Sequence, residues 1–341
     1  YIVKPGALGR HGHRGYLSEY WGMVAGEQVF LQPISHPIGD AKVIFNTPPG
    51  YEVIVNWPQD SDGSFKPNVY EQGALFTDSL AYSTIAFGRL VAEKQIVGDA
   101  EVTVWMFKDW EPEVREELAR KVFSLCEYYE GVFGEFPEGP YDVVFTPYAK
   151  DGVKVVGGMW STGIGLTTPG NDSWEWQLVS HRLFHRFSWY KPYGTKLPEE
   201  SDIWFLEGKP NYYQIMSLEA IGLTDSSKEF SILYQSYLSQ KGKNDGPLTT
   251  QADPKNPDQW EYLSFVKAPL VAKMMADKLK KDSLGEKSFG EFNLIQYQKF
   301  GHLKGTYDLK KELEEYSGKE WKEFFAKYVE GTEELPSLYY E

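Results

Sequence analysis

The sequence predicts an α+β fold: an N-terminal antiparallel β domain, then a domain with a small sheet and a helical C-terminal half. Three observations predict this order. Short β-rich runs separated by Pro and Gly fill roughly the first 105 residues. From Glu111 the apolar residues recur with a helical period, and beyond Asn171 the chain is typical of helices throughout.

The N-terminal β domain is expected over residues 1–107. Its strands are predicted at three β-rich runs separated by Pro and Gly, 28–31, 41–45 and 51–55, and at 98–105, where apolar and polar residues alternate.

The second domain is expected over residues 108–341. Pro112 lies near a predicted helix start, and the apolar residues Val114, Leu118, Val122 and Cys126 follow at four-residue steps. A mixed sheet is expected at about 141–168, from a strand at 141–145 and a Gly-rich stretch at 155–166. Helices are predicted from about residue 172, at about 172–190, 202–222, 226–240, 258–281, 286–300 and 306–329.

Composition excludes several classes of protein. The chain has 35 basic and 49 acidic residues, a net charge of −14, which argues against nucleic acid or an anionic membrane as partner. No apolar stretch is long enough for a membrane-spanning segment. Cys126 is the single cysteine and is expected in the core. The start at Tyr1 instead of Met is compatible with a processed or extracytoplasmic chain, and the compartment stays open.

Residues 181–185, His-Arg-Leu-Phe-His, carry the strongest chemical signal. Histidines four apart on a helix share one face and can bind one metal ion, as in the zinc-peptidase motif H-E-x-x-H. Glu207, on the next predicted helix, would complete a His, His, Glu ligand set for zinc. Because the glutamate of the motif is absent, the histidine pair alone also fits ordinary core or surface histidines.

Five further segments, in chain order, resemble the gluzincin zinc aminopeptidases, and two of them the glycyl aminopeptidase branch. They are F-T-D-S-L at 76–80, G-G-M at 157–159, W-F-L-E-G-x-x-x-Y-Y at 204–213, F-V-K-A-P-L-V-A at 265–272 and Y-V-E-G-T-E-E-L-P at 328–336. The resemblance implies a thermolysin-like second domain, Glu207 as third zinc ligand, and a substrate groove lined by Gly157, Gly158, Met159 and Trp160.

This chain departs from the family pattern at three positions. Arg182 stands where the family has its general-base glutamate, and Phe265 where it has the tyrosine that hydrogen-bonds the oxyanion. Trp160 stands where a glutamate holds the substrate's amino terminus. A general base typically contributes about 10²–10⁴ to the rate and one oxyanion donor about 10²–10³. Because both groups are replaced, little hydrolysis by the usual route is expected, and no residue of this chain is expected to be catalytic.

Two states of the metal site stay open. A guanidinium about 5 Å from zinc costs about 7 kcal/mol at an effective dielectric near 20, against roughly 10–16 kcal/mol for structural zinc binding. Zinc on His181, His185 and Glu207 therefore remains feasible, more so if Arg182 turns outward. Alternatively, Arg182 pairs with Glu207 and replaces the ion.

The sequence therefore favours an inactive relative of the glycyl aminopeptidases that binds a peptide or protein partner through the retained groove. One alternative is an active zinc peptidase with another base, for which Glu199, Glu200 and Asp202 are the nearest acidic residues. Another is a subunit of a larger assembly with a vestigial site. Tyr262, about one turn before Phe265, is a less favoured substitute for the missing hydroxyl.

Overall fold

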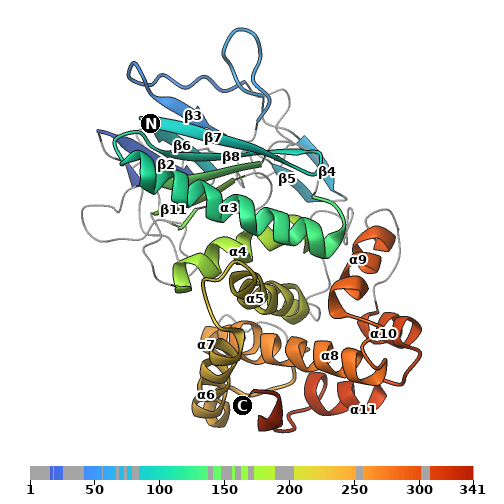
Figure 1. Cartoon of the computed structure of the whole chain (residues 1–341). Helices are drawn as coiled ribbons and strands as arrows, with labels where there is room; N and C mark the ends of the chain where they lie inside the picture. Colours follow the sequence, from blue (N-terminus) through green and yellow to red (C-terminus); the bar gives the residue numbers. More distant parts are fainter. Residues whose placement is uncertain are drawn as a thin grey trace. The chain divides into compact units, whose positions relative to one another are not determined.

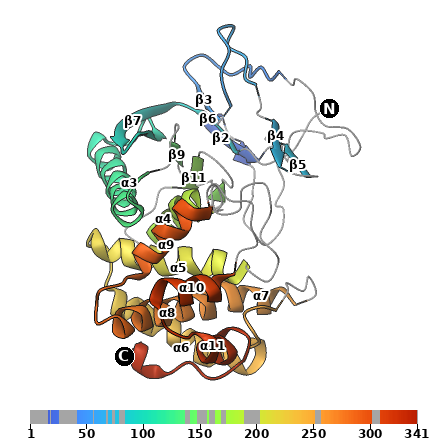
Figure 2. The same cartoon turned by 90° about the vertical axis from the view of Figure 1, so that its right-hand side faces the viewer.

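The computed structural model divides the chain into two compact units, drawn in Figure 1 and Figure 2. Unit 1 comprises Tyr1–Glu127 and Glu135–Glu175, and unit 2 comprises Tyr128–Gly134 and Trp176–Glu341. The structure describes residues 16–17, 19–25, 42–55, 57–66, 69–72, 75–78, 84–136, 141–146, 156–157, 163–167, 173–188, 203–250, 256–300 and 308–340.

Unit 1 begins with an antiparallel sheet in the order β1-β2-β6-β3. Its strands are β1 (Tyr16–Leu17), β2 (Trp21–Ala25), β6 (Thr84–Gly88) and β3 (Glu52–Ile54). A separate antiparallel pair follows β3 in the chain, β4 (Val69–Gln72) with β5 (Leu75–Asp78). The predicted strand at 51–55 is confirmed as β3, whereas 28–31 lies outside the described residues. Of 41–45, the described part forms only an isolated bridge, between Val43 and Phe65.

The second sheet of unit 1 has five strands in the order β10-β11-β9-β8-β7. They are β10 (Val156–Gly157), β11 (Gly163–Thr167), β9 (Tyr141–Thr146), β8 (Ala100–Phe107) and β7 (Leu90–Val97). The sheet is mixed as predicted, because β9 runs parallel to both β8 and β11 while the outer pairs are antiparallel. The predicted boundary between an N-terminal domain (1–107) and a second domain (108–341) stays a prediction.

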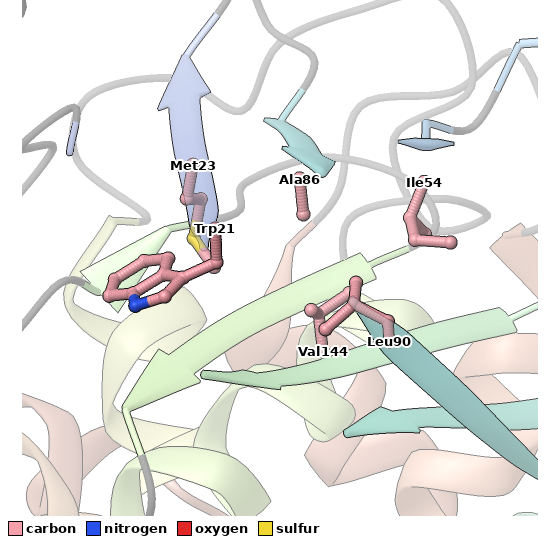
Figure 3. Packing of buried hydrophobic residues seen from close by; sticks show 6 residues of the cluster. All are labelled: Trp21, Met23, Ile54, Ala86, Leu90 and Val144. Atoms are coloured by element: carbon pink, nitrogen blue, oxygen red, sulfur yellow. The ribbon is translucent and has the colours of Figure 1, made fainter. Parts of the chain in front are cut away.

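A small apolar core joins strands of both sheets in unit 1. Trp21 and Met23 of β2, Ile54 of β3 and Ala86 of β6 pack with two residues of the five-stranded sheet, Leu90 and Val144 (Figure 3). All six are buried. Alternating strand residues point to the same face, so β2 contributes two residues two positions apart.

Helix α3 (Pro112–Phe133) begins at the predicted proline, which fits the first turn because its missing amide hydrogen needs no partner there. Gln95 of β7 donates a hydrogen bond to Glu127 of this helix (2.7 Å). Cys126 is fully buried, as predicted, and burial raises the pKa of its thiol.

Unit 2 is helical and includes the C-terminal end of α3. Its elements are α4 (Ser173–Ser188, from Trp176 onward), α5 (Ile203–Ala220), α6 (Ser226–Asn244), α7 (Pro257–Tyr262), the π-helix η2 (Leu263–Lys267), α8 (Ala268–Asp282), α9 (Phe289–Phe300), α10 (Leu309–Ser317), α11 (Lys322–Phe324), the π-helix η3 (Phe325–Val329) and the 3₁₀ turn η4 (Ser337–Tyr339). Both views show α5 running between α4 and α8.

Two predicted helices are interrupted. The helix expected at 258–281 contains η2, because Pro269 has no amide hydrogen to bond the carbonyl four residues back, and the Ala268 amide instead reaches Leu263 (five residues back). The helix expected at 306–329 ends at Ser317, where Gly318 takes a left-handed conformation (φ 68°) as a C-cap.

Aromatic rings from α3, α4, α5 and α9 pack together in the core of unit 2. Phe133 stacks on Phe187 with centroids 4.4 Å apart, and Phe184 stacks on Tyr213 at 5.0 Å. Tyr213 in turn stacks on Phe289 of α9. Rings bury large areas and fix the spacing of the helices that carry them, so this cluster positions α4 against α5.

The predicted fold class is confirmed: an N-terminal antiparallel sheet, a second small sheet and a mostly helical C-terminal half. No helix among the described residues combines the length and apolar character needed to span a membrane.

Candidate metal centre

Helix α4 places His181 and His185 one turn apart on one face. Their Nε2 atoms lie 2.9 Å apart, and their rings meet at 84° with centroids separated by 4.6 Å. His181 is buried, and the side chain of His185 is 12% exposed. Elsewhere on the helix, the side chains of Leu183, Phe184 and Phe187 are buried in the core. This packing fixes the orientation of α4 and so of its two histidines.

Glu207 of α5 joins the two histidines. Its Oε2 lies 3.2 Å from His181 Nε2 and 3.6 Å from His185 Nε2, and the three donor atoms lie within 4.8 Å of one another. Zinc bonds of 2.0–2.1 Å in a tetrahedral site put ligand atoms about 3.3 Å apart. The separations in this cluster bracket that value, and two imidazoles with one carboxylate are a donor set that zinc takes. The structure thus brings the three predicted ligands together in an arrangement that fits the ion.

The electrostatics of the cluster suit a metal ligand set. Burial lowers the pKa of His185 to about 4, against the attraction of the Glu207 carboxylate. Burial would raise the pKa of Glu207, but the two imidazoles hold it well below its usual range by charge and hydrogen bonding. At neutral pH the pair is therefore an uncharged imidazole and a carboxylate, the forms that bind metals.

Asn211 is a residue of the site that sequence reasoning missed. Its Nδ2 donates to the Glu207 carbonyl (2.7 Å), so its Oδ1 faces His181 Nδ1 and accepts from it at 3.2 Å. A proton on Nδ1 leaves the Nε2 lone pair free to point at the cluster. The signal in the sequence is spacing: Asn211 follows Glu207 by four residues, one helical turn.

Two features of unit 2 fix α5 relative to its neighbours. A Cβ added to Gly208 would lie 2.8 Å from the Cβ of Ala268, so the residue after Glu207 must be glycine for α5 to approach α8 this closely. On the other side, Ser180 Oγ lies 2.6 Å from both Tyr129 Oη and Ser217 Oγ, a buried chain of hydroxyls linking α3, α4 and α5. Both contacts adjoin a cluster residue in sequence.

Arg182 lies on the same side of α4 as His185, three residues before it, where side chains are neighbours. Arg182 is half-buried. Burial is the main cause that lowers the pKa of His185, and the positive charge of Arg182 lowers it further. A guanidinium stays protonated in proteins, so it cannot accept a proton from water. The second position of the His-x-x-x-His segment thus carries a cation close in sequence to the candidate ligands.

Phe265 lies next to His181, with ring centroids 6.3 Å apart, and the ring of Trp260 meets that of Phe265 edge-on at 5.5 Å. It is half-buried and sits within η2. Its ring carries no donor. Tyr262, the other aromatic candidate, is 1% exposed and stacks on Tyr237. Its hydroxyl has no hydrogen-bond partner among the described residues, so its contacts are those of a core residue.

A buried ion pair anchors η2. The side chain of Lys267 is fully buried, and its Nζ donates to Asp245 Oδ1 and to the Gly246 carbonyl, each at 2.8 Å. Burial lowers the pKa of Lys267 while the Asp245 carboxylate opposes that shift. The pair ties the segment after α6 to the π-helix that carries Phe265.

Several predicted residues lie outside what the structure describes. Gly157 is in β10, but Gly158, Met159 and Trp160 are not among the described residues, nor are Glu199, Glu200 and Asp202. The groove lining and the substitute bases therefore stay predictions.

Comparisons with known proteins give a consistent picture of the fold. No family model and no curated protein matches the chain. Among solved structures, it is similar to an aminopeptidase N family protein from Idiomarina loihiensis, with a TM-score of 0.76 and 17% identity. That match covers 96% of this chain and 62% of the other, so the chain spans less than two thirds of that relative's length.

Two further structures agree. The M1 zinc metallopeptidase from Deinococcus radiodurans matches with a TM-score of 0.62 and 17% identity, covering 98% of this chain and 75% of the other. A two-domain M1 zinc metallopeptidase variant bound to L-tryptophan matches with 0.59 and 17%, covering 97% and 75%. At this identity the likeness concerns the fold, and the conclusion is that this chain has the gluzincin fold of the M1 aminopeptidases.

Proposed function

We propose that this protein is a catalytically inactive relative of the glycyl aminopeptidases that holds zinc on His181, His185 and Glu207 and binds peptides or a partner protein there. The observation that carries the proposal is the combination of a cluster with zinc-like spacing and a guanidinium at the base position. The spacing is 2.9, 3.2 and 3.6 Å between donor atoms.

Metal binding is supported by the state of the ligands. The three donors converge, Asn211 holds the tautomer of His181, and Glu207 is ionised at neutral pH. When bound, zinc supplies a Lewis acid that polarises a carbonyl oxygen. The cation at 182 weakens the ion's affinity without removing a ligand, since Arg has no part in the donor set.

Loss of cleavage is supported by what stands beside the cluster. Arg182 cannot take a proton, and Phe265, whose ring contacts His181, has no hydroxyl to donate to a developing oxyanion. Each loss costs about 10²–10⁴ or 10²–10³ in rate, and together they leave little hydrolysis by the usual route. Half-buried rings of Phe265 and Trp260 favour binding of apolar groups instead.

The glycyl aminopeptidase branch and the groove of Gly157, Gly158, Met159 and Trp160 enter this proposal through sequence resemblance. The D-S element at 78–79 and the Y-V-x-G-T-E-x-L-P ending at 328–336 support the branch. The relatives of known structure include one that binds L-tryptophan, which supports a ligand of amino-acid or peptide character.

The test joins metal analysis to a peptidase assay. The purified protein is expected to hold one zinc and to leave a panel of fluorogenic amino-acid amides and peptides uncut. Arg182→Glu with Phe265→Tyr is expected to restore chelator-sensitive cleavage. The matched control is Arg182→Gln with Phe265→Tyr, which regains the hydroxyl without a base and is expected to stay inactive. Chelator-sensitive cleavage by the unchanged protein at an ordinary metallopeptidase rate would overturn the proposal.

A further inference from the structure

We infer that the π-helix η2 and Pro269 form a positioning element of the metal centre, which acts on His181 through Asn211. The element leaves the Ser264 carbonyl of η2 to the side-chain amide of Asn211. The inference rests on the proposed function, since it treats His181 as a metal ligand, and it adds the part of the fold that sets the tautomer of this ligand.

The helix that carries Ser264 directs its amides away from the carbonyl of this buried residue. In an α-helix the carbonyl would accept from Ala268, four residues on, but the Ala268 amide bonds Leu263 instead. In a π-helix it would accept from residue 269, which is a proline and carries no amide hydrogen. Because a buried carbonyl without a donor is costly, a donor from another element stabilises this one.

Asn211 of α5 supplies that donor. Its Nδ2 lies 3.5 Å from the Ser264 carbonyl oxygen and 2.7 Å from that of Glu207, so its two hydrogens go to two carbonyls. The two helices approach closely nearby, at Gly208 and Ala268. Asn211 lies one turn further along α5, and Ser264 lies one turn back from Ala268.

The two carbonyls decide which way the Asn211 amide points. A flipped amide would set its oxygen against both carbonyl oxygens. With both hydrogens of Nδ2 committed, Oδ1 faces His181 Nδ1 at 3.2 Å and accepts its proton. The lone pair on His181 Nε2 is then directed to Glu207 and His185, as metal binding requires. The 3.5 Å contact is the weaker of the two, so its loss is expected to loosen the amide without releasing it.

Pro269→Ala tests this arrangement, because it returns an amide hydrogen to the segment. In the π register the new amide reaches Ser264, and in the α register Ala268 does, so in both the carbonyl gains a donor from its own helix. We expect zinc affinity, measured by competition with a chromophoric chelator, to fall roughly two- to fivefold, the lower part of the range for one hydrogen bond. The matched control is Pro257→Ala in the first turn of α7, which is expected to leave zinc affinity unchanged.

The tautomer of His181 is a readout that a general loss of stability would not move. Long-range proton–nitrogen NMR spectra of the metal-free protein at about pH 8, where ordinary imidazoles are uncharged, report which ring nitrogen carries the proton. We expect the proton on Nδ1 in the unchanged protein and in Pro257→Ala, and a rise in the Nε2–H form in Pro269→Ala. His181→Gln assigns the signal.

A double-variant cycle shows whether the effect passes through Asn211. Asn211→Ala removes the side-chain amide, so adding Pro269→Ala is expected to change zinc affinity no further. An equal fall in both backgrounds, no fall in either, the same fall in Pro257→Ala, or an unchanged His181 tautomer in Pro269→Ala overturns the inference. Protein that takes up no zinc overturns the proposed function, and the His181 spectra of the metal-free proteins then decide the inference by themselves.

Discussion

Asn211 accepts a hydrogen bond from Nδ1 of His181 while its own amide donates to the Glu207 backbone. The Asn211 side chain therefore orients His181, the candidate ligand on α4, and is itself held by the backbone of Glu207, the candidate ligand on α5. Such partners of metal-binding histidines are worth 10- to 100-fold in metal affinity. The centre thus comprises four residues: the three candidate metal ligands and Asn211, which positions one of them.

Replacement of Asn211 should weaken zinc binding. Asn211→Ala removes the acceptor from His181 Nδ1, and we expect zinc affinity to fall about 10- to 100-fold, measured by competition with a chromophoric chelator. Asn211→Asp keeps an acceptor at that place and should retain affinity within a few fold. Unchanged zinc affinity in Asn211→Ala would show that the hydrogen bond plays no part in ligand positioning.

Gly208 should resist even a methyl group. Gly208→Ala would put a Cβ 2.8 Å from the Cβ of Ala268 and force α5 away from α8, at an expected cost of about 1–3 kcal/mol in the free energy of unfolding. Gly242→Ala on α6 meets open space and should stabilise the protein by up to about 1 kcal/mol through helix propensity. Denaturant unfolding of both variants measures the contrast; equal effects would mean the close approach is not needed.

The buried pair of Lys267 and Asp245 should be costly to break from one side. Lys267→Met leaves a largely buried carboxylate without its partner, and we expect a loss of about 3–5 kcal/mol in the free energy of unfolding. The double variant with Asp245→Asn removes both charges and should recover much of that loss. A double variant as unstable as Lys267→Met would point to packing of the lysine stem as the source of the effect.

The stability of the protein should carry a pH signature from Asp142 of β9. Burial raises the pKa of this carboxyl in the folded protein, although Trp105 Nε1 donates a hydrogen bond to it at 2.7 Å. A raised folded pKa means that the folded state binds the proton more tightly than the unfolded state. The stabilisation this gives is complete below the ordinary value of 3.8 and is lost as the pH rises through the folded pKa.

Asp142→Asn removes this titration and keeps an acceptor for Trp105. We expect the variant to be more stable than the unchanged protein at pH 7, with the difference shrinking toward pH 3.5, in denaturant unfolding at a series of pH values. A difference that stays constant with pH would show that the carboxyl does not titrate differently on folding.

Local information in the chain determined much of this protein. The spacing of His181 and His185, the cation between them and the helical period around them are visible in sixteen residues of α4, because neighbours on a helix are set by its pitch. The α+β order and the start of α3 at Pro112 follow from local patterns in the same way. The helix end at Gly318 is also local: the prediction of one helix over 306–329 is wrong because this glycine caps the C-terminus of α10.

Tertiary structure alone decided the rest. Glu207 meets the histidines because α5 packs against α4, where the buried hydroxyls of Ser180 and Ser217 join the two helices. On the side of α8, Gly208 allows α5 to approach Ala268 closely. Asn211 gains its role from a partner thirty residues away, and the parallel pairing of β9 with β8 joins strands separated by the whole of α3. Helix pitch sets which side chains share a face, but which faces meet is set by the packing of whole elements.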